Sequence, residues 1–414
     1  MWAELGLDLG RHDELLAAIE RSFQRSHQWQ KSRPKAMKYF DDSVHASHGS
    51  RVAEVWNHRK GGGKSIGTFC IYVPDEIALA AGVVPMPLCG GNNWSVNHAD
   101  RMFPRDICPI VRSTFGMAFS KTCPYKTLKD LAVGETTCDA KKKAWDLMGF
   151  EVLEVPQKKR PIDRELWQQE VLGFKDTMER LAGISITAER LAEAVELCDR
   201  RRQVLRQING LRSLDEPPLS GLDALLVSQI ALSQDIRTFI KHAEILLDEL
   251  RDRAAKGISA YERPGMRVVL AGSPSPLGYA KVHYVVESAG MRIVADESCT
   301  GTRYFRDLVG PVSDDIDSML SAIADRYFKI DCACFSPNQE RVDNLRKLID
   351  DYRAQGVVHT VLQFCHGFDI EAKLLDRALA AAKVPSIKIV TDFSEEDVEQ
   401  IRVRLEAFRE VAYA

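Results

Sequence analysis

The sequence predicts an α/β protein in which a helical segment joins two parallel-sheet domains. Short apolar runs of strand length alternate with helical patterns in two separate regions. The region between them is almost wholly helical. With 414 residues and 45% hydrophobic content, the chain is long enough for two or three domains of roughly 100 to 200 residues each.

The first region opens with a helical lead-in over residues 1–60, followed by an α/β domain over residues 61–160. A strand-like apolar run at 66–73, a helix at 74–82 and a strand at 83–88 form a unit typical of parallel sheets. The same alternation continues with a strand at 131–133, a helix at 139–148 and a strand at 151–155.

Residues 161–260 form the predicted helical segment, with Thr187 as the N-cap of one helix. The second α/β domain covers residues 261–414. Its predicted strands lie at 266–272, 291–295, 356–364 and 386–390. Two Rossmann- or flavodoxin-like domains on either side of a helical bridge place a cleft between them, where loops from both domains meet.

The composition excludes several classes of function. The formal net charge is −3, from 56 basic and 59 acidic residues, so no global field favours binding to nucleic acid. The first residues lack the basic and apolar segments of a signal peptide, and no later stretch is long and apolar enough to span a membrane. We therefore expect a cytoplasmic protein that binds neither nucleic acid nor membranes.

A glycine run ending in Lys64 and Ser65 resembles the phosphate-binding loop of NTPases. The full pattern requires a further glycine where this chain has His58, and the run precedes a strand instead of following one. We do not expect ATP to bind at this run.

The ten cysteines are the most informative residues, because disulfides are rare in a reducing cytoplasm. Cys138, Cys299 and Cys365 each follow a predicted strand. Cys332 and Cys334 lie in a predicted strand-to-loop step before a helix. Because the carboxyl ends of parallel strands meet at one edge of a sheet, these cysteines are candidate ligands at a shared site.

Cys108 and Cys123 are each followed by proline, which keeps the cysteine extended and provides no competing N–H. The spacings match neither paired zinc ligands nor the ferredoxin pattern, so both domains would contribute ligands. Cys89 could line the cleft or pack beneath it. Cys70 and Cys198 are interpreted as small buried core residues.

Two residues near these cysteines are candidate catalytic proton donors, His366 beside Cys365 and Glu135 three residues before Cys138. His366 could equally be a structural hydrogen-bonding residue in its loop. The run Lys141 to Lys143 begins a helix and is interpreted as a solvated face, with docking to a partner as the alternative.

Several motifs together resemble the superfamily of 2-hydroxyacyl-CoA dehydratases and benzoyl-CoA reductases, and within it the double-cubane cluster proteins most closely. The resemblance extends over nearly the whole chain. It is carried by Pro104-Arg-Asp-Ile-Cys-Pro-Ile-Val-Arg-Ser-Thr-Phe-Gly116, Lys121-Thr-Cys-Pro-Tyr125, Val133-Gly-Glu-Thr-Thr-Cys138, Glu297-Ser-Cys-Thr-Gly301, Cys332-Ala-Cys-Phe-Ser-Pro-Asn338 and Gln363-Phe-Cys-His366.

The resemblance implies a set of ligands. Cys108, Cys138 and Cys365 would hold one [4Fe-4S] cubane. Cys123, Cys299 and either Cys332 or Cys334, with Cys334 favoured, would hold a second cubane to complete an [8Fe-9S] cluster. At Ser273, which ends a predicted strand, some relatives carry a cysteine, so a ligand at that position would change this set.

The resemblance also implies a homodimeric chain and a separate partner, a homodimeric ATPase with its own [4Fe-4S] cluster that delivers low-potential electrons. The expected activity is reduction of a small-molecule substrate. The first alternative is a one-cubane subunit of a 2-hydroxyacyl-CoA dehydratase or benzoyl-CoA reductase type enzyme. The second is a non-catalytic electron carrier.

Overall fold

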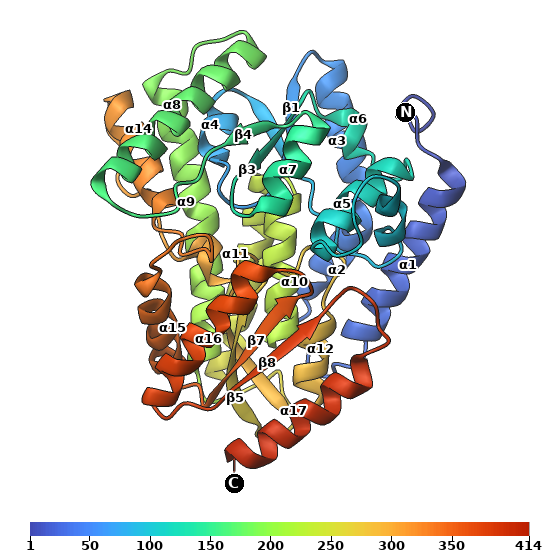
Figure 1. Ribbon diagram of the computed structural model, residues 1–414, viewed down its shortest axis with the longest axis vertical. Helices are drawn as coiled ribbons and strands as arrows, with labels where there is room; N and C mark the ends of the chain where they lie inside the picture. The colour runs from blue at the N-terminus through green and yellow to red at the C-terminus, as the bar shows by residue number, and fades with distance from the viewer. Residues whose placement is uncertain (414) are drawn as a thin grey trace.

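The computed structural model describes residues 1–413 and contains two four-stranded sheets in which all neighbouring strands are parallel. The strand order is β2-β1-β3-β4 in the first sheet and β6-β5-β7-β8 in the second. The two sheets lie one above the other along the long axis of the molecule, and helices run beside both (Figure 1). The predicted fold class is confirmed.

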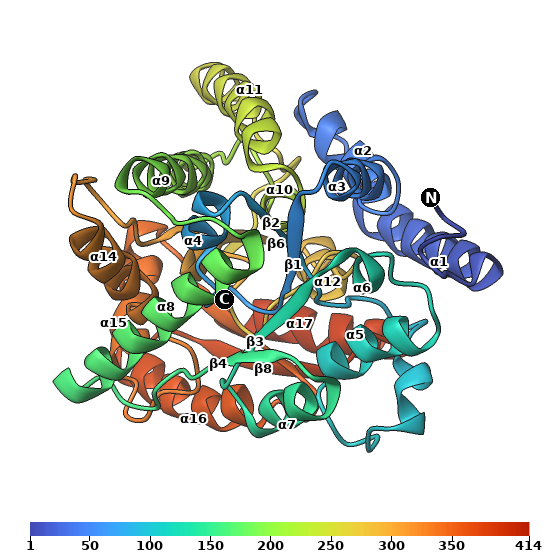
Figure 2. The same cartoon turned by 90° about the horizontal axis from the view of Figure 1, so that it is seen from above.

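The N-terminal helices α1 (Leu9–His27), α2 (Met37–Ala46) and α3 (Ser50–Lys60) pack along one flank of the molecule (Figure 2). The first sheet and the helices that connect its strands come next. They are β1 (Lys64–Thr68), α4 (Asp75–Ala80), β2 (Val83–Pro87), η1 (Val96–Arg101), α5 (Pro109–Phe119), α6 (Tyr125–Leu128), β3 (Leu131–Glu135), α7 (Asp139–Met148) and β4 (Glu151–Leu153).

A helical segment then connects the sheets through α8 (Pro161–Ala182), α9 (Ala188–Gly210), η2 (Leu211–Ser213), α10 (Gly221–Ser233) and α11 (Ile236–Ala255). Local signals set the ends of these helices. Pro161 occupies the first turn of α8, where its missing N–H costs nothing, and the helix ends at Gly183 in the left-handed conformation. Thr187 caps α9 by accepting the N–H of Arg190, as predicted.

The second sheet alternates strands and helices in the order β5 (Met266–Gly272), α12 (Lys281–Ser288), β6 (Met291–Glu297), α13 (Thr302–Phe305), α14 (Ile316–Phe328), α15 (Gln339–Asp351), β7 (Gly356–Leu362), α16 (His366–Ala381), β8 (Ser386–Thr391) and α17 (Val398–Tyr413). Every residue of β6 and β7 is buried, as expected for parallel strands covered on both faces.

Two local predictions were wrong. The apolar run at 66–73 is not one strand, because β1 ends at Thr68 and the chain then turns through Cys70, which has a φ of 80°. Cys332 and Cys334 do not follow a strand. They lie in the loop between α14 and α15.

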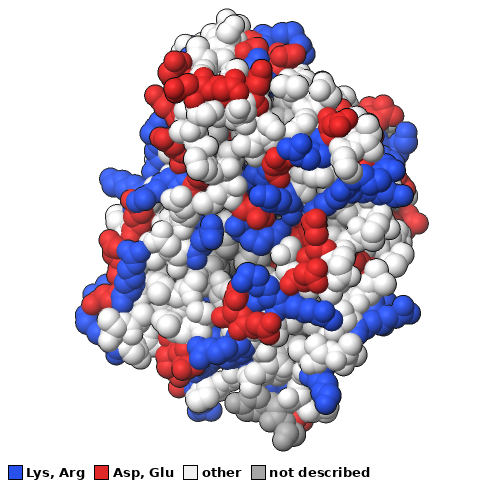
Figure 3. Space-filling view, turned by 90° about the vertical axis from the view of Figure 1, so that its left-hand side faces the viewer, with Lys and Arg blue, Asp and Glu red and all other residues white. Residues whose placement is uncertain are grey.

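The surface carries charges of both signs. On the face drawn in Figure 3, Lys and Arg side chains lie among Asp and Glu side chains, and neither sign forms an unbroken field. This mixture agrees with the formal net charge of −3. Among the described residues, no helix is long and apolar enough to cross a membrane.

The close packing of α5 makes Gly116 sensitive to substitution. A Cβ at Gly116 would lie 1.8 Å from the carbonyl oxygen of Ser95. We expect Gly116→Ala to lower the free energy of unfolding by about 1–3 kcal/mol. Gly173, on the exposed surface of α8, has open space around its Cα. As the matched control, Gly173→Ala should raise the free energy of unfolding by about 0.5–1 kcal/mol in the same urea titration. A similar change in both variants would contradict this account.

Candidate functional site

The loops that follow the strands of both sheets enclose one cavity of about 570 Å³. Nine of the ten cysteines line it, namely Cys70, Cys89, Cys108, Cys123, Cys138, Cys299, Cys332, Cys334 and Cys365. The tenth, Cys198, is fully buried in α9 within the apolar core, as predicted. All ten are free thiols.

Three of these cysteines form a first group, each at the N-cap of a helix. Cys108 precedes α5, Cys138 precedes α7 and Cys365 precedes α16. The helices contain 11, 10 and 16 residues, and the positive ends of their dipoles therefore face the thiols. Such an environment favours thiolates, which are the form of cysteine that binds metals.

Burial acts in the opposite direction on this first group. It raises the pKa of Cys108 to about 11 and that of Cys365 to about 12, and it also raises the pKa of Cys138. The nearby thiols contribute, because Cys138 affects both Cys108 and Cys365. The Lys141 ammonium and a backbone N–H at the start of α7 partly offset the rise at Cys138.

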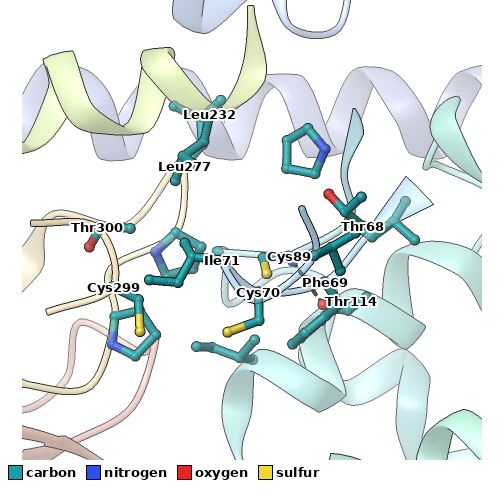
Figure 4. A pocket seen from close by; sticks show the side chains of 18 of the residues that line it. Thr68, Phe69, Cys70, Ile71, Cys89, Thr114, Leu232, Leu277, Cys299 and Thr300 are labelled. Atoms are coloured by element: carbon teal, nitrogen blue, oxygen red, sulfur yellow. Dashed lines mark hydrogen bonds between the residues drawn. The ribbon is translucent and has the colours of Figure 1, made fainter. Parts of the chain in front are cut away.

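A second group consists of Cys70, Cys299, Cys332 and Cys334, and the buried Tyr72 interacts with all four. The side chains of Cys70 and Cys299 enter the cavity from different sheets and approach the same space (Figure 4). Their interaction lowers the pKa of Cys299 to about 6 and raises that of Cys70. The contact with Cys334 likewise lowers the pKa of Cys332.

Cys70 was interpreted from the sequence as a buried core residue, and the structure corrects this. It follows β1, lines the cavity and adopts a φ of 80°, which is uncommon for a residue other than glycine. Unusual backbone conformations of this kind cluster at functional sites. The sequence signal for this role is that Cys70 follows a strand. The apolar residues after Cys70 concealed the end of that strand, because they made the run look continuous.

Cys123 differs from the other cysteines of the cavity. Burial raises the pKa of its thiol, and the strongest opposing groups are the backbone of Lys126 and Tyr125 and the ammonium group of Lys129. Each of the other eight has another cysteine among its strongest neighbours, whereas Cys123 does not. Cys123 packs instead against the apolar cluster that contains Tyr125 and Leu128.

Cys89, which the sequence left open, also lines the cavity. Its thiol is near Cys70 and Cys299, and burial raises its pKa to about 11. It therefore lies at the margin of the second group.

Glu135, one predicted proton donor, is fully buried at the end of β3 and does not line the cavity. Its Oε1 lies 2.5 Å from the Lys141 Nζ and accepts a hydrogen bond of 2.7 Å from the Thr137 hydroxyl. Lys141 itself lines the cavity, so the interpretation of Lys141 to Lys143 as one solvated face is corrected. Only Lys143 is largely exposed, at 78% of its side chain.

Behind the second group lies a network of buried charges. The Arg303 guanidinium donates to the Cys299 sulfur at 3.5 Å and pairs with Glu297 and Asp331. Arg341 also pairs with Glu297, at 3.1 Å. The network fixes a cation against Cys299 and adds to the lowering of its pKa.

Two further residues are near the first group. His366, the other predicted proton donor, is the first residue of α16 and lines the cavity beside Cys365. Ser273 follows β5, lines the cavity and accepts the N–H of Leu362 at 3.1 Å. Its hydroxyl also favours the Cys365 thiolate.

The donor set fits an iron–sulfur centre better than a single ion. Within residues 1–413, no three His, Cys, Asp or Glu side chains are grouped so that they could hold one metal ion. The cysteines of an iron–sulfur cluster bind different iron atoms, so they surround a larger volume. A cavity lined by nine thiols provides that volume and the thiolate ligands.

These features define a class: an α/β protein with a cysteine-lined cavity between two parallel sheets. A sequence profile of the family described as 2-hydroxyglutaryl-CoA dehydratase, D-component, matches residues 70–412, and the chain belongs to this family. The superfamily resemblance seen in the motifs is thereby confirmed.

Curated relatives extend over most of the chain. The putative dehydratase subunit YjiM of Escherichia coli (strain K12) is 34% identical over 357 residues, which are 84% of this chain and 91% of that protein. A benzoyl-CoA reductase subunit of Thauera aromatica is 26% identical, over 86% and 93% of the two chains. The (R)-phenyllactyl-CoA dehydratase beta subunit of Clostridium sporogenes is 23% identical, over 90% and 98%. The family is thus one of enzymes.

Proposed function

We propose that this protein is an iron–sulfur reductase that reduces a small molecule in the cysteine-lined cavity. The observation that carries the proposal is the convergence of nine thiols, from the loops of both sheets, on one cavity. A single structural cysteine needs no such arrangement, and all ten cysteines are free thiols, so disulfide pairing does not account for it.

The two groups of cysteines suggest the ligands of an [8Fe-9S] double cubane. Cys108, Cys138 and Cys365 would hold one cubane, as the family resemblance implies. For the second cubane we propose Cys70, Cys299 and either Cys332 or Cys334. Cys70 replaces Cys123 in this set because its thiol contacts Cys299, whereas the principal neighbours of Cys123 include no cysteine.

When bound, such a cluster supplies low-potential electrons and an iron atom at which a substrate can bind. The chain's own residues would exclude water and supply protons. Apolar side chains such as Ile71, Leu232 and Leu277 cover one wall of the cavity (Figure 4). His366, which lines the cavity beside Cys365, is the proposed proton donor. We do not retain Glu135 in that role, because it does not line the cavity and its carboxylate is paired with Lys141.

The charges of the cavity favour a small substrate without phosphate groups. Four cationic side chains line it, and each is paired with a carboxylate: Arg51 with Glu54, Lys141 with Glu135, Lys142 with Asp139 and Arg201 with Asp75. A CoA ester carries phosphates, which proteins bind with free Arg and Lys side chains. Within the described residues, the cavity wall provides no unpaired Lys or Arg for them.

We further propose that electrons come from a separate homodimeric ATPase with its own [4Fe-4S] cluster, and that this chain forms a homodimer in the cytoplasm. The proposal follows the family, in which the named relatives are dehydratase and reductase subunits. A separate ATPase is compatible with the glycine run of this chain. Lys64 and Ser65, which would belong to a phosphate-binding loop, are already part of strand β1.

Iron analysis after anaerobic purification tests the proposed function. We expect about eight iron atoms per chain, with matching acid-labile sulfide, and reduction of the cluster by the ATPase with ATP. About four iron atoms, together with tight binding of a CoA ester, would favour the one-cubane dehydratase alternative. A chain that binds no iron would contradict both. A reducible cluster without turnover of any small substrate would indicate an electron carrier.

A further inference from the structure

Lys141, whose side chain is 18% exposed, places its ammonium group at the wall of the cysteine-lined cavity. It lies in the first turn of α7, and its Nζ is 5.0 Å from the centre of the Phe69 ring. The Nζ is 2.5 Å from the Glu135 Oε1 and 3.1 Å from the Thr137 Oγ1. Glu135 and Thr137 therefore hold the ammonium in one position, and Glu135 does so from outside the cavity.

The ammonium lies between the two groups of cysteines. After Glu135, the groups that act most strongly on Lys141 are Cys70, from the second group, and Cys138, from the first. Lys141 also acts on Cys108 and Cys299, again one from each group. Of the four cations that line the cavity, it is the one placed to act on both groups.

The ammonium stays charged in this position. Burial alone would lower the pKa of Lys141, but Glu135 and the nearby thiols outweigh burial and raise the pKa well above its usual range. A lysine with one fixed charge is therefore present at the cavity over the whole physiological pH range.

We propose that Lys141, positioned by Glu135, sets the reduction potential of the cluster held by the two cysteine groups. The inference rests on the proposed function. Each added electron places a negative charge in a buried site, where a nearby cation stabilises the reduced state and raises the potential. Glu135 partly cancels that cation. Lys141 is thus a positioning and charge-compensating residue and not a ligand.

Substitutions of Lys141 and of Glu135 should shift the midpoint potential of the cluster in opposite directions. Lys141→Met removes the cation and should make the midpoint potential more negative. Glu135→Gln keeps the side-chain shape, removes the opposing negative charge and should make the potential more positive. Lys141→Arg keeps the charge and should remain closest to the wild type. Lys143→Met is the matched control, because it makes the same change on the same helix at a side chain that is 78% exposed and does not line the cavity.

The measurement is a potentiometric titration of the anaerobically purified proteins, followed by electron paramagnetic resonance, with iron content determined on each sample. Shifts of opposite sign in Lys141→Met and Glu135→Gln, with Lys143→Met unchanged, would support the inference. Equal potentials in all variants, or shifts of the same sign, would overturn it. If Lys141→Met does not bind iron, the sign of the Glu135→Gln shift decides.

Failure of this inference can be told apart from failure of the proposed function. A wild-type chain that binds no iron contradicts the proposed function before any potential is measured. A wild-type chain that binds iron, but whose potential does not respond to Lys141 and Glu135, contradicts only the role of this pair.

Discussion

Arg202→Met is expected to lower the free energy of unfolding by about 3–5 kcal/mol, measured in urea by circular dichroism under anaerobic conditions. Arg202 in α9 and Glu76 in α4 are both 0% exposed, and their charged groups are 2.5 Å apart. The Glu76 carboxylate also accepts the Tyr327 hydroxyl at 2.8 Å. Removing the guanidinium leaves a buried carboxylate without its cation, at a joint between the first sheet and the helical segment that solvent does not reach.

Two further variants separate charge from packing. Arg200→Met changes the neighbouring residue, whose side chain is 57% exposed and pairs with Glu244 at the surface, and should cost less than about 1 kcal/mol. Arg202→Met combined with Glu76→Gln should recover part of the stability lost in the single variant, because the buried Glu76 carboxylate is replaced by a neutral amide. If the double variant is as unstable as Arg202→Met alone, lost packing and not the unpaired carboxylate explains the effect.

The pH dependence follows from the same pair. Burial would raise the pKa of Glu76, but Arg202, followed by Arg326, outweighs burial and lowers it. In the wild type, the ionised carboxylate therefore contributes stability above the pKa of the unfolded chain, and this contribution is lost as the pH falls through the lower folded value. In Arg202→Met, the strongest group that opposes burial is lost, so the folded pKa of Glu76 should be higher than in the wild type. The variant's deficit should accordingly shrink as the pH falls from 7 toward about 4.5.

The strand-end cysteines could be predicted from the sequence because parallel strands impose a simple geometry. Once the strands before Cys138, Cys299 and Cys365 were recognised, their carboxyl ends had to meet at the same edge of each sheet. The structure places all three at the cavity. Only the carboxyl ends of the strands differed, by two residues each, which does not change where the cysteines lie.

Cys108 and Cys123 show why a short motif could not decide between two cysteines. Both precede proline, and the sequence treats them alike. In the structure, Pro109 begins an 11-residue helix whose N-cap is Cys108. Pro124 is itself the N-cap of the four-residue helix α6, and Tyr125 and Leu128 anchor that helix in an apolar cluster. Whether the cysteine begins a long helix therefore depends on how the residues after each proline pack, and the Cys-Pro pair alone does not contain that information.

The inward position of Lys141 had a signal in the sequence that the charge pattern concealed. On a helix, residues four apart share a face, so Lys141 lies on the same side as Trp145. Trp145 is fully buried and its indole donates to the Glu135 carbonyl at 2.9 Å. The apolar face of α7 therefore includes Lys141, while Lys143 points to solvent. Interpreting the three lysines as one run overlooked the helical period, which places Lys141 and Lys143 on different faces of α7.

The decisive experiment on the ligand set compares Cys70→Ser with Cys123→Ser. Serine has nearly the same shape as cysteine, but its hydroxyl is a poor iron ligand, so each variant tests the thiol itself. We expect Cys70→Ser to bind about half the iron of the wild type, because the second cubane loses a ligand that faces Cys299. Cys123→Ser should retain the wild-type iron content, because Lys129 and the backbone of Lys126 surround its thiol.

The opposite result would restore Cys123 to the second cubane, as the motif resemblance alone implies. Wild-type iron content in both variants would place neither thiol on iron, and Cys89, at the margin of the same group, would then be the next candidate. Cys198→Ser supplies no matched control, because its thiol is fully buried in the core and the added hydroxyl would lack a partner. Cys123→Ser is thus the better control for Cys70→Ser: it makes the same substitution in the wall of the same cavity, and any loss of iron confined to Cys70→Ser must come from the loss of its thiol.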